Sequence, residues 1–178
     1  RVLLDCPAQT LTHLQKLELE IDQLDLILLS HQHSDHVIGM DLLLLELTMG
    51  RASRRERPLR IAAPPGVYER VAEIIGGAPR MTPEDDDRIT WIEMHDGAGF
   101  EWEGVTVQAV EVDHTPALFL AVGSRAEIDG KPIASTGDTH ICAPLHTPPP
   151  RASPPRPARV ARPPPVPSAV PPSPPPHP

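Results

Sequence analysis

The residues best suited to chemistry in this sequence lie together in the segment 30–36, Ser-His-Gln-His-Ser-Asp-His. Three imidazoles and a carboxylate follow directly after the apolar run 24–29. If the chain leaves a strand still extended, His31 and His33 point to the same side, about 6.6 Å apart at a rise of ~3.3 Å per residue. Two imidazoles at that separation can bind one divalent ion through Zn–N bonds of about 2.0–2.1 Å.

Asp35 and His36 follow as the chain turns, so we expect them to face a second ion beside the first. Two ions about 3.5–4 Å apart can hold a hydroxide and stabilise both the attacking and the leaving oxygen of a hydrolysis. The alternative is a polar turn whose histidines only form hydrogen bonds and caps. We favour the metal site, because the motif stands where an apolar strand gives way to a helix.

The elements that must position these residues alternate between strands and helices in the first half of the chain. The run 26–29 is uninterrupted and apolar, as in strands that are buried on both faces. The helix after the motif is apolar nearly all round, so it should be buried, and Asp35 is placed to cap it. The expected strands are 1–5, 26–29, 59–63 and 89–94, and the expected helices are 10–19, 37–49 and 67–75.

Hairpins follow in the second half of the expected domain. The segments 100–102 and 105–112 should pair around Glu103-Gly104, and the segments 117–122 and 132–135 should pair through Asp129-Gly130. Asp-Gly is a strong signal for a hairpin turn. Alternating strands and helices followed by hairpins predict an α/β protein with layered architecture.

The order His-x-His-x-Asp-His at a strand end resembles the metallo-β-lactamase-fold hydrolases, in the branch that includes ribonuclease Z-like and phosphodiesterase-like members. The resemblance covers residues 2 to about 145, although Pro7 stands where glycine is expected. It implies a layered αββα sandwich, which would be incomplete here. The further matching segments are Leu4-Asp5-Cys6, Pro64-Pro65-Gly66 and Gly137-Asp138-Thr139.

The resemblance also implies the remaining ligands of two divalent ions, zinc or alternatively manganese. A lone histidine after a strand completes the nitrogens of the first ion, and we favour His114 over His95 because it shortly precedes Gly137-Asp138. Asp138 would bridge the ions, and its glycine neighbour lets the backbone approach closely. Asp35 would also take or orient a proton in catalysis, and Asp5 could orient a ligand histidine. The implied metal ligands are His31, His33, Asp35, His36, His114 and Asp138.

The function implied is a metal-dependent hydrolase whose dinuclear site activates a hydroxide against a phosphodiester or related ester, in a small molecule or in RNA. A ribonuclease Z-like tRNA 3′-processing endonuclease is the second hypothesis, and a β-lactamase is the third. Ribonuclease Z grips tRNA with an inserted arm, and only a hairpin is expected between His114 and Asp138. A catalytically impaired homologue, or an adapter with a proline-rich tail, is the non-enzymatic alternative.

Composition supports one domain, residues 1–146, followed by a tail, residues 147–178. The chain has 178 residues and a formal net charge of -8, which does not favour binding to nucleic-acid phosphates. Two cysteines make no disulfide framework, and no run of about 20 apolar residues predicts a membrane span. We therefore expect a cytoplasmic protein without a membrane partner, with a homodimer left open.

The tail is unlike the rest of the chain. It holds 16 of the 25 prolines and four arginines without an acidic residue, so it leaves 12 basic residues against 24 acidic ones elsewhere. Its lack of periodicity predicts disorder or a polyproline-like conformation. It could also dock onto a proline-recognising domain. The family pattern, which continues with a helix, a strand and a last metal-binding histidine, stops near 142–145. With Arg1 already inside a strand, the chain is expected to be truncated at both ends.

A shifted reading frame is our preferred explanation of the tail, because Arg, Pro and Ala dominate it without pattern. We predict that one of the other two frames, translated beyond codon 140, continues with a helix, a strand and a histidine. Sequencing and translating the DNA checks this. If neither frame continues in that way, the hypothesis is wrong.

Overall fold

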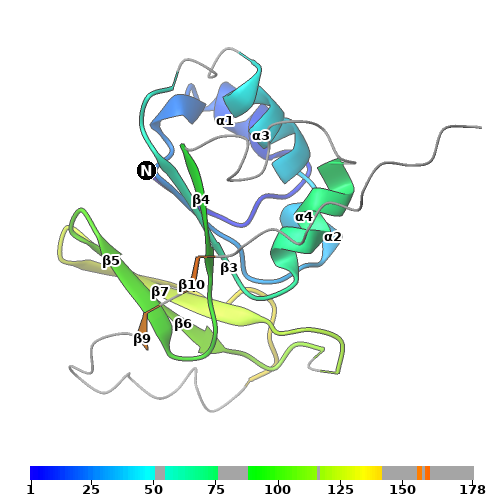
Figure 1. Ribbon diagram of the computed structural model, residues 1–178, viewed down its shortest axis with the longest axis vertical. Coiled ribbons are helices and arrows are strands. Elements are labelled where there is room, and N and C mark those ends of the chain that lie inside the picture. Colours follow the sequence, from blue (N-terminus) through cyan, green and yellow to red (C-terminus); the bar gives the residue numbers. More distant parts are fainter. Residues whose placement is uncertain (51–54, 76–87, 116, 142–155, 158, 161–178) are drawn as a thin grey trace, which may run out of the picture.

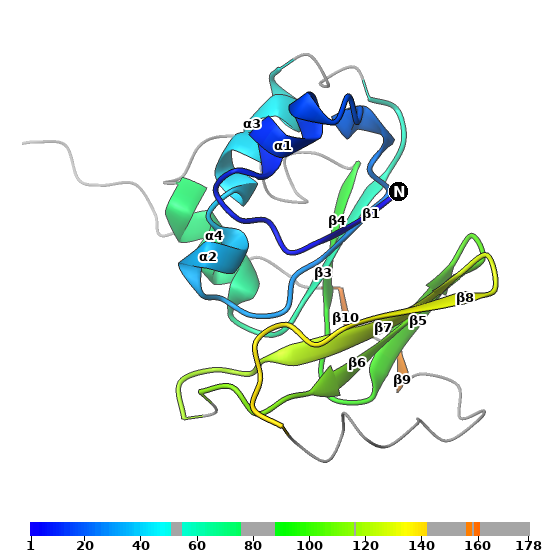
Figure 2. The same ribbon diagram turned by 180° about the vertical axis from the view of Figure 1, so that it is seen from behind.

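Two β-sheets stacked face to face form the centre of the structure, and helices cover the outer face of one of them (Figures 1 and 2). The computed structural model describes residues 1–50, 55–75, 88–115, 117–141, 156–157 and 159–160. The acidic run 84–87 and most of the tail lie outside these residues. The α/β layered architecture predicted from the sequence is confirmed.

The first sheet has the order β1-β2-β3-β4-β10, and β1 to β4 are parallel. Leu4 of β1 lies opposite Leu28 of β2, so both strands end at the same edge of the sheet. Parallel neighbours need a crossover between them, and helices supply it here. The strands are β1 (Val2–Leu4), β2 (Leu26–Leu28), β3 (Leu59–Ala63), β4 (Ile89–Glu93) and β10 (Arg159–Val160).

The second sheet has the order β8-β7-β6-β5-β9 and is antiparallel except for the β5–β9 pair. Both two-residue turns have positive φ at both positions, as type I′ turns require, and they are Glu103-Gly104 and Asp129-Gly130. The strands are β5 (Ala98–Trp102), β6 (Val105–Glu111), β7 (Val122–Ile128), β8 (Lys131–Ser135) and β9 (Arg156–Pro157).

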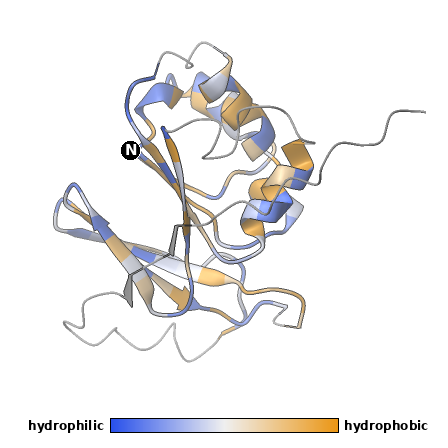
Figure 3. Ribbon diagram, viewed as in Figure 1, coloured by the Kyte–Doolittle hydropathy of each residue, from blue (hydrophilic) through white to orange (hydrophobic). Residues whose placement is uncertain are grey.

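The alternation of side chains along β2 divides the core into two parts. Leu26 and Leu28 face the second sheet, while Ile27 and Leu29 face the helices. The helix side also buries Leu43, Leu44 and Leu47. Figure 3 shows apolar and polar residues mixed along the helices. The helices are α1 (Thr10–Lys16), the 3₁₀ helix η1 (Ile21–Gln23), α2 (Ser34–Val37), α3 (Met40–Thr48) and α4 (Val67–Ile75).

No helix of the described part of the chain covers the outer face of the second sheet (Figures 1 and 2). The described residues therefore form three of the four layers of the αββα sandwich, and the incompleteness of the fold stays a prediction. Within the tail, β9 and β10 each pair with a sheet edge, which differs from the prediction of disorder for these four residues. Disorder of the rest of the tail stays a prediction.

The helix expected at 37–49 is interrupted, and this expectation was wrong. The chain forms α2 and then α3, with Ile38 and Gly39 between them. Asp35 does not cap a helix, because it lies in the first turn of α2 and His33 occupies the capping position. Leu42 and Leu45 are 51% and 40% exposed, so α3 is not buried all round.

Two further boundaries differ from the sequence prediction. The helix α1 ends at Lys16, three residues short of the expected end at 19, and Leu17 beyond it is 67% exposed. The strand expected at 117–122 instead runs over Val122–Ile128, directly up to the Asp129-Gly130 turn. We expected a strand here because residues 117–121 are apolar. These residues instead precede β7 and lie next to the histidines.

In the part of the chain that the structure describes, no helix is long and apolar enough to cross a membrane. The only α-helices found there have four to nine residues.

Close packing at Gly39 fixes the start of α3 against the loop after β1. A Cβ atom built on Gly39 would collide with the carbonyl oxygen of Pro7 and would lie 2.8 Å from that of Cys6. The Gly39 N–H also donates to the Cys6 carbonyl at 2.9 Å. Because the colliding atoms are backbone, a side chain here would push α3 away from the loop that carries Asp5.

We predict that Gly39→Ala lowers the free energy of unfolding by about 3 kcal/mol, as expected for overpacking against backbone. Gly97→Ala is the control, since its Cβ meets nothing within 4 Å and only its φ of +70° opposes a side chain. That strain should cost about 1 kcal/mol. Denaturant unfolding of the two variants measures the difference. Equal stability of the two would contradict the packing argument.

Candidate metal centre

Three histidine side chains from two distant segments converge beyond the end of β2. His31 Nε2 lies 2.9 Å from His33 Nδ1, which lies 3.0 Å from His114 Nε2. His31 and His33 come from the extended segment after β2, and His114 comes from the loop after β6. All three nitrogens lie within 4.8 Å of one another, so this group could hold a metal ion.

A second group shares His31 with the first. It adds His36 from α2 and Asp138 from the loop after β8, again with one ligand atom each within 4.8 Å. His36 Nε2 lies 3.5 Å from Asp138 Oδ1 and 3.7 Å from Asp35 Oδ2. The two groups therefore lie side by side, with the fully buried His31 between them.

The structure thus brings together five of the six predicted ligands and leaves Asp35 at the margin. The Asp35 side chain is 78% exposed and belongs to neither group, although it lies beside His36. His95, the competitor of His114, instead contacts Glu93 Oε1 at 2.7 Å and is half exposed. The assignment of these residues as ligands stays a prediction.

A carboxylate next to the histidines orients the second group. Asp5 follows β1, and its Oδ2 accepts a hydrogen bond from His36 Nδ1 at 2.8 Å, so His36 Nε2 is free to face Asp138. Asp5 Oδ1 accepts from the Ser30 N–H at 2.7 Å. A histidine that binds metal through one nitrogen commonly donates its other N–H to such a carboxylate. The predicted orienting role of Asp5 fits this geometry.

Phe119 forms an apolar wall beside the first group, and the sequence analysis missed it. Its ring stacks on His31 at 5.8 Å and meets His33 edge-to-face at 4.8 Å. Aromatic pairs of this kind restrict ring orientation. No local signal identified Phe119, because it lies far from the motif in sequence and was assigned to an expected strand.

The environment separates the proton affinities of two neighbouring imidazoles. Burial lowers the pKa of His31 to about 4, and the nearby rings of His36, His114 and His33 add to the effect. Burial alone would also lower the pKa of His36. The hydrogen bond and the charge of Asp5, with Asp138 and Asp35, outweigh burial and raise the pKa of His36. His31 is therefore neutral at pH 7, as a metal ligand must be.

The residues present fit a divalent metal ion by their chemistry and spacing. In a tetrahedral zinc site with bonds of about 2.0–2.1 Å, ligand nitrogens lie roughly 3.3 Å apart. The contacts of 2.9 and 3.0 Å within the first group are close to that spacing. The second group offers two nitrogens and a carboxylate oxygen, which also suit such an ion.

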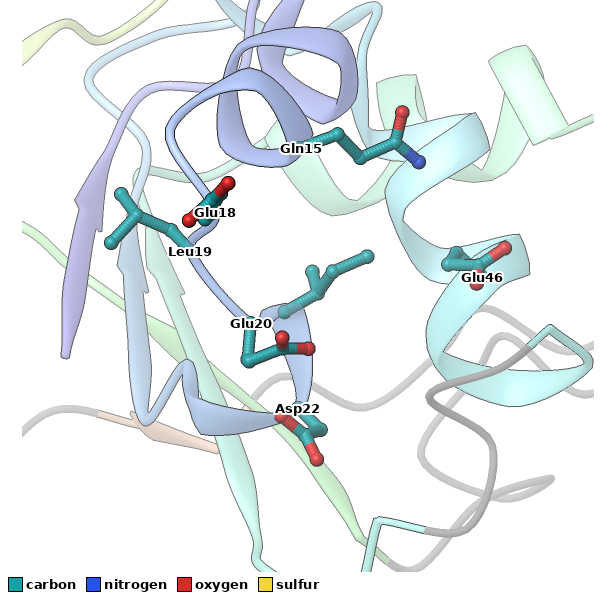
Figure 4. A pocket seen from close by; sticks show the side chains of 7 residues that line it. Gln15, Glu18, Leu19, Glu20, Asp22 and Glu46 are labelled. Atoms are coloured by element: carbon teal, nitrogen blue, oxygen red, sulfur yellow. The ribbon is translucent and has the colours of Figure 1, made fainter.

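A separate pocket between α1, η1 and α3 has a different character (Figure 4). Its volume is about 440 Å³, and it offers four carboxylates but no histidine or cysteine. It shares no residue with either metal-binding group. Its lining residues are Gln15, Glu18, Leu19, Glu20, Ile21, Asp22 and Glu46.

Comparison with known sequences identifies one family and several relatives. The profile of the family described as β-lactamase superfamily domain matches residues 1–148. A ribonuclease Z of Mycobacterium marinum is 28% identical over 152 residues, which cover 80% of this chain and 54% of the relative. A ribonuclease Z of Agathobacter rectalis is 31% identical over 128 residues, 71% of this chain and 39% of the relative. The chain thus spans about half the length of these relatives, or less.

Solved structures share the fold. Human tRNase Z, short form, has a TM-score of 0.56 at 22% identity, over 77% of this chain and 57% of that one. The metallo-β-lactamase fold protein YhfI of Bacillus subtilis has a TM-score of 0.59 at 18% identity, over 77% of this chain and 51% of that one. At these identities the similarity establishes the fold alone.

The low pKa of His31 makes the stability of the metal-free protein depend on pH. Between pH 6.5 and about 4 the unfolded chain protonates this residue but the folded chain does not. Acidification therefore favours unfolding, and the stability present above pH 6.5 falls by at most about 3 kcal/mol. The raised pKa of His36 acts in the opposite direction.

To isolate His31, we compare the wild type with His31→Asn, which cannot titrate. We predict that the free energy of unfolding falls more steeply from pH 6.5 to pH 4 in the metal-free wild type than in the variant. Chemical denaturation across this range provides the measurement. Parallel pH profiles would show that burial does not hold His31 neutral.

Proposed function

Because this chain belongs to the family of β-lactamase superfamily domains, we propose that it is a metal-dependent hydrolase acting on a phosphodiester or related ester. The observation that carries the proposal is the convergence of ring nitrogens from His31, His33 and His114. Segments more than 80 residues apart in sequence meet there within hydrogen-bond distance. Such a group of nitrogen donors suits zinc or another divalent ion.

The proposed ligands divide between two ions. His31, His33 and His114 would hold the first, and His36 with Asp35 would hold the second. Asp138 would serve both ions, because a carboxylate has two oxygens. A bound ion would lower the pKa of a water molecule to about 7 and so supply a hydroxide nucleophile at neutral pH. Zinc is favoured over manganese, because imidazoles dominate the donor set and manganese prefers oxygen ligands.

Side chains of the protein would orient the ligand histidines and accept the proton. Asp5 accepts from His36 Nδ1 and so directs His36 Nε2 toward the reacting region. Phe119 excludes water from one side of the histidines. Asp35 is the proposed proton acceptor, because its side chain is exposed and ends 3.7 Å from His36 Nε2. An exposed carboxylate can take or orient a proton from an incoming nucleophile.

Cleavage of precursor tRNA is the second candidate, favoured by the relatives named ribonuclease Z. We rank it second for two reasons. The chain is acidic, with a formal net charge of -8. The described residues between His114 and Asp138 form the β7–β8 hairpin and its approach, which leaves no inserted arm there for gripping tRNA. Cytoplasmic location and homodimer formation stay predictions.

We predict that the zinc-loaded protein hydrolyses a chromogenic phosphodiester and that His33→Ala lowers the rate at least about 100-fold, because a ligand of the first ion is lost. His95→Ala is the matched control, since this histidine also follows a strand but contacts Glu93. Steady-state rates at saturating zinc provide the measurement. Equal rates in the two variants would reject the site.

Binding of the isolated tail to an SH3-type domain, without metal, would favour the alternative that this chain is an adapter protein.

Metal content tests the second ion separately. The family pattern stops near residues 142–145, before its expected helix, strand and last histidine, so the second ion would depend on Asp35, His36 and Asp138. We predict one tightly bound zinc per chain, a second that is lost on desalting, and low activity. Elemental analysis after gel filtration measures this. A content near two per chain with full turnover would contradict the prediction.

Substrate class is decided by a parallel assay. We predict that the protein cleaves the small phosphodiester faster than a precursor tRNA at equal concentration. Cleavage of the tRNA alone, at its 3′ side, would move the ribonuclease Z-like activity to first place.

A further inference from the structure

The hydroxyl of Ser30 stands between the carboxylate of Asp5 and the ring of His31. Ser30 Oγ lies 2.9 Å from Asp5 Oδ2 and 2.9 Å from His31 Nδ1. It lies at 3.5 Å from His36 Nδ1, the limit of a hydrogen bond, and that nitrogen already reaches Asp5 at 2.8 Å. The hydroxyl thus connects His31 with the same carboxylate that His36 contacts directly.

The number of protons fixes the direction of these hydrogen bonds. A hydroxyl has one proton to donate and two lone pairs, whereas a carboxylate can only accept. The Ser30 proton must therefore go to Asp5. The contact with His31 is then formed only if Nδ1 carries a proton and donates it to Ser30 Oγ. A neutral imidazole with its proton on Nδ1 has its lone pair on Nε2.

We propose that Ser30 is a positioning residue that holds His31 in the Nδ1–H tautomer, so that its Nε2 lone pair faces His33 and His114. The inference rests on the proposed function, because it concerns the same metal-binding group. Nε2 of His31 is the atom that lies 2.9 Å from His33 Nδ1. Without the hydroxyl, the ring could place its proton on the nitrogen that must bind the ion.

Burial makes the hydroxyl difficult to replace by water. Ser30 is 7% exposed and His31 is fully buried. Gly137 covers the hydroxyl, since a Cβ built there would lie 2.6 Å from Ser30 Cβ and 2.9 Å from Oγ. Because Gly137 has no side chain, the backbone before Asp138 can pass close to Ser30. Little room is left beside the Ser30 side chain.

The backbone of Ser30 is held independently of its side chain. Its N–H donates to Asp5 Oδ1 at 2.7 Å, and its carbonyl accepts from the Val122 N–H at 2.9 Å. Both bonds remain in Ser30→Ala, which removes only the hydroxyl. The variant should therefore fold, and its effect should be confined to the two imidazoles and Asp5.

The test uses ¹⁵N-labelled, metal-free protein, in which long-range ¹H–¹⁵N spectra report the tautomer of each neutral imidazole. In mildly alkaline buffer we expect His31 of the wild type to be in the Nδ1–H form alone. Ser30→Ala should show a mixture of tautomers, because Nδ1 of His31 then has no hydroxyl to accept its proton. A wild-type His31 protonated on Nε2 would overturn the proposal, whether or not any variant folds.

Zinc titration of the same proteins gives the second readout. Loss of an orienting partner typically weakens metal binding 10–100-fold, so we expect a loss of that size for Ser30→Ala. The matched control is Ser34→Ala, because Ser34 lies in the same motif, at the start of α2, but its hydroxyl accepts from Arg70 Nη2 at 3.1 Å. Equal zinc affinity of Ser30→Ala and Ser34→Ala would overturn the proposal.

The two readouts separate this inference from the proposed function. If the wild type binds no zinc, the hydrolase proposal fails, and the tautomer spectrum still decides the role of Ser30. If the wild type binds zinc and hydrolyses the phosphodiester while Ser30→Ala matches it in affinity and tautomer, only the inference on Ser30 fails.

Discussion

The structure of the site depends on the hydrogen bonds that Asp5 accepts at the end of β1. Its two oxygens receive the Ser30 N–H, the Ser30 hydroxyl and His36 Nδ1. These three groups belong to the end of β2 and to α2. Since β1 and β2 are parallel and end at the same edge, a single carboxylate can connect both strand ends to the first turn of the helix. Charge-assisted hydrogen bonds of this kind are the stronger ones.

This connection also separates the properties of two adjacent imidazoles. The ring centroids of His31 and His36 lie 4.1 Å apart, yet burial lowers the pKa of His31 and the carboxylates raise that of His36. His31 reaches Asp5 only through a hydroxyl, while His36 contacts it directly. The side chains of the two groups come from α2 and from the segments that follow β2, β6 and β8, three strands of two different sheets.

The sequence predicted most of the elements because their signals are local. The apolar run of β2, the strand β3, the helix α4 and both two-residue turns follow from composition and turn chemistry, and the family resemblance was confirmed. The break at Gly39 was missed, because it results from contact with the Cys6 and Pro7 carbonyls, which lie more than 30 residues away. Ser30 was part of the motif, but its role depends on Asp5 across the strand pair. Phe119 reaches the site only through tertiary packing.

The central claim is that these histidines bind a metal ion directly. Zinc K-edge X-ray absorption on the zinc-loaded chain, after desalting, tests it. We predict a first shell at about 2.0–2.1 Å with the outer-shell scattering of two or three imidazoles. A shell of oxygen atoms without imidazole scattering, or the loss of all zinc on desalting, would contradict the account.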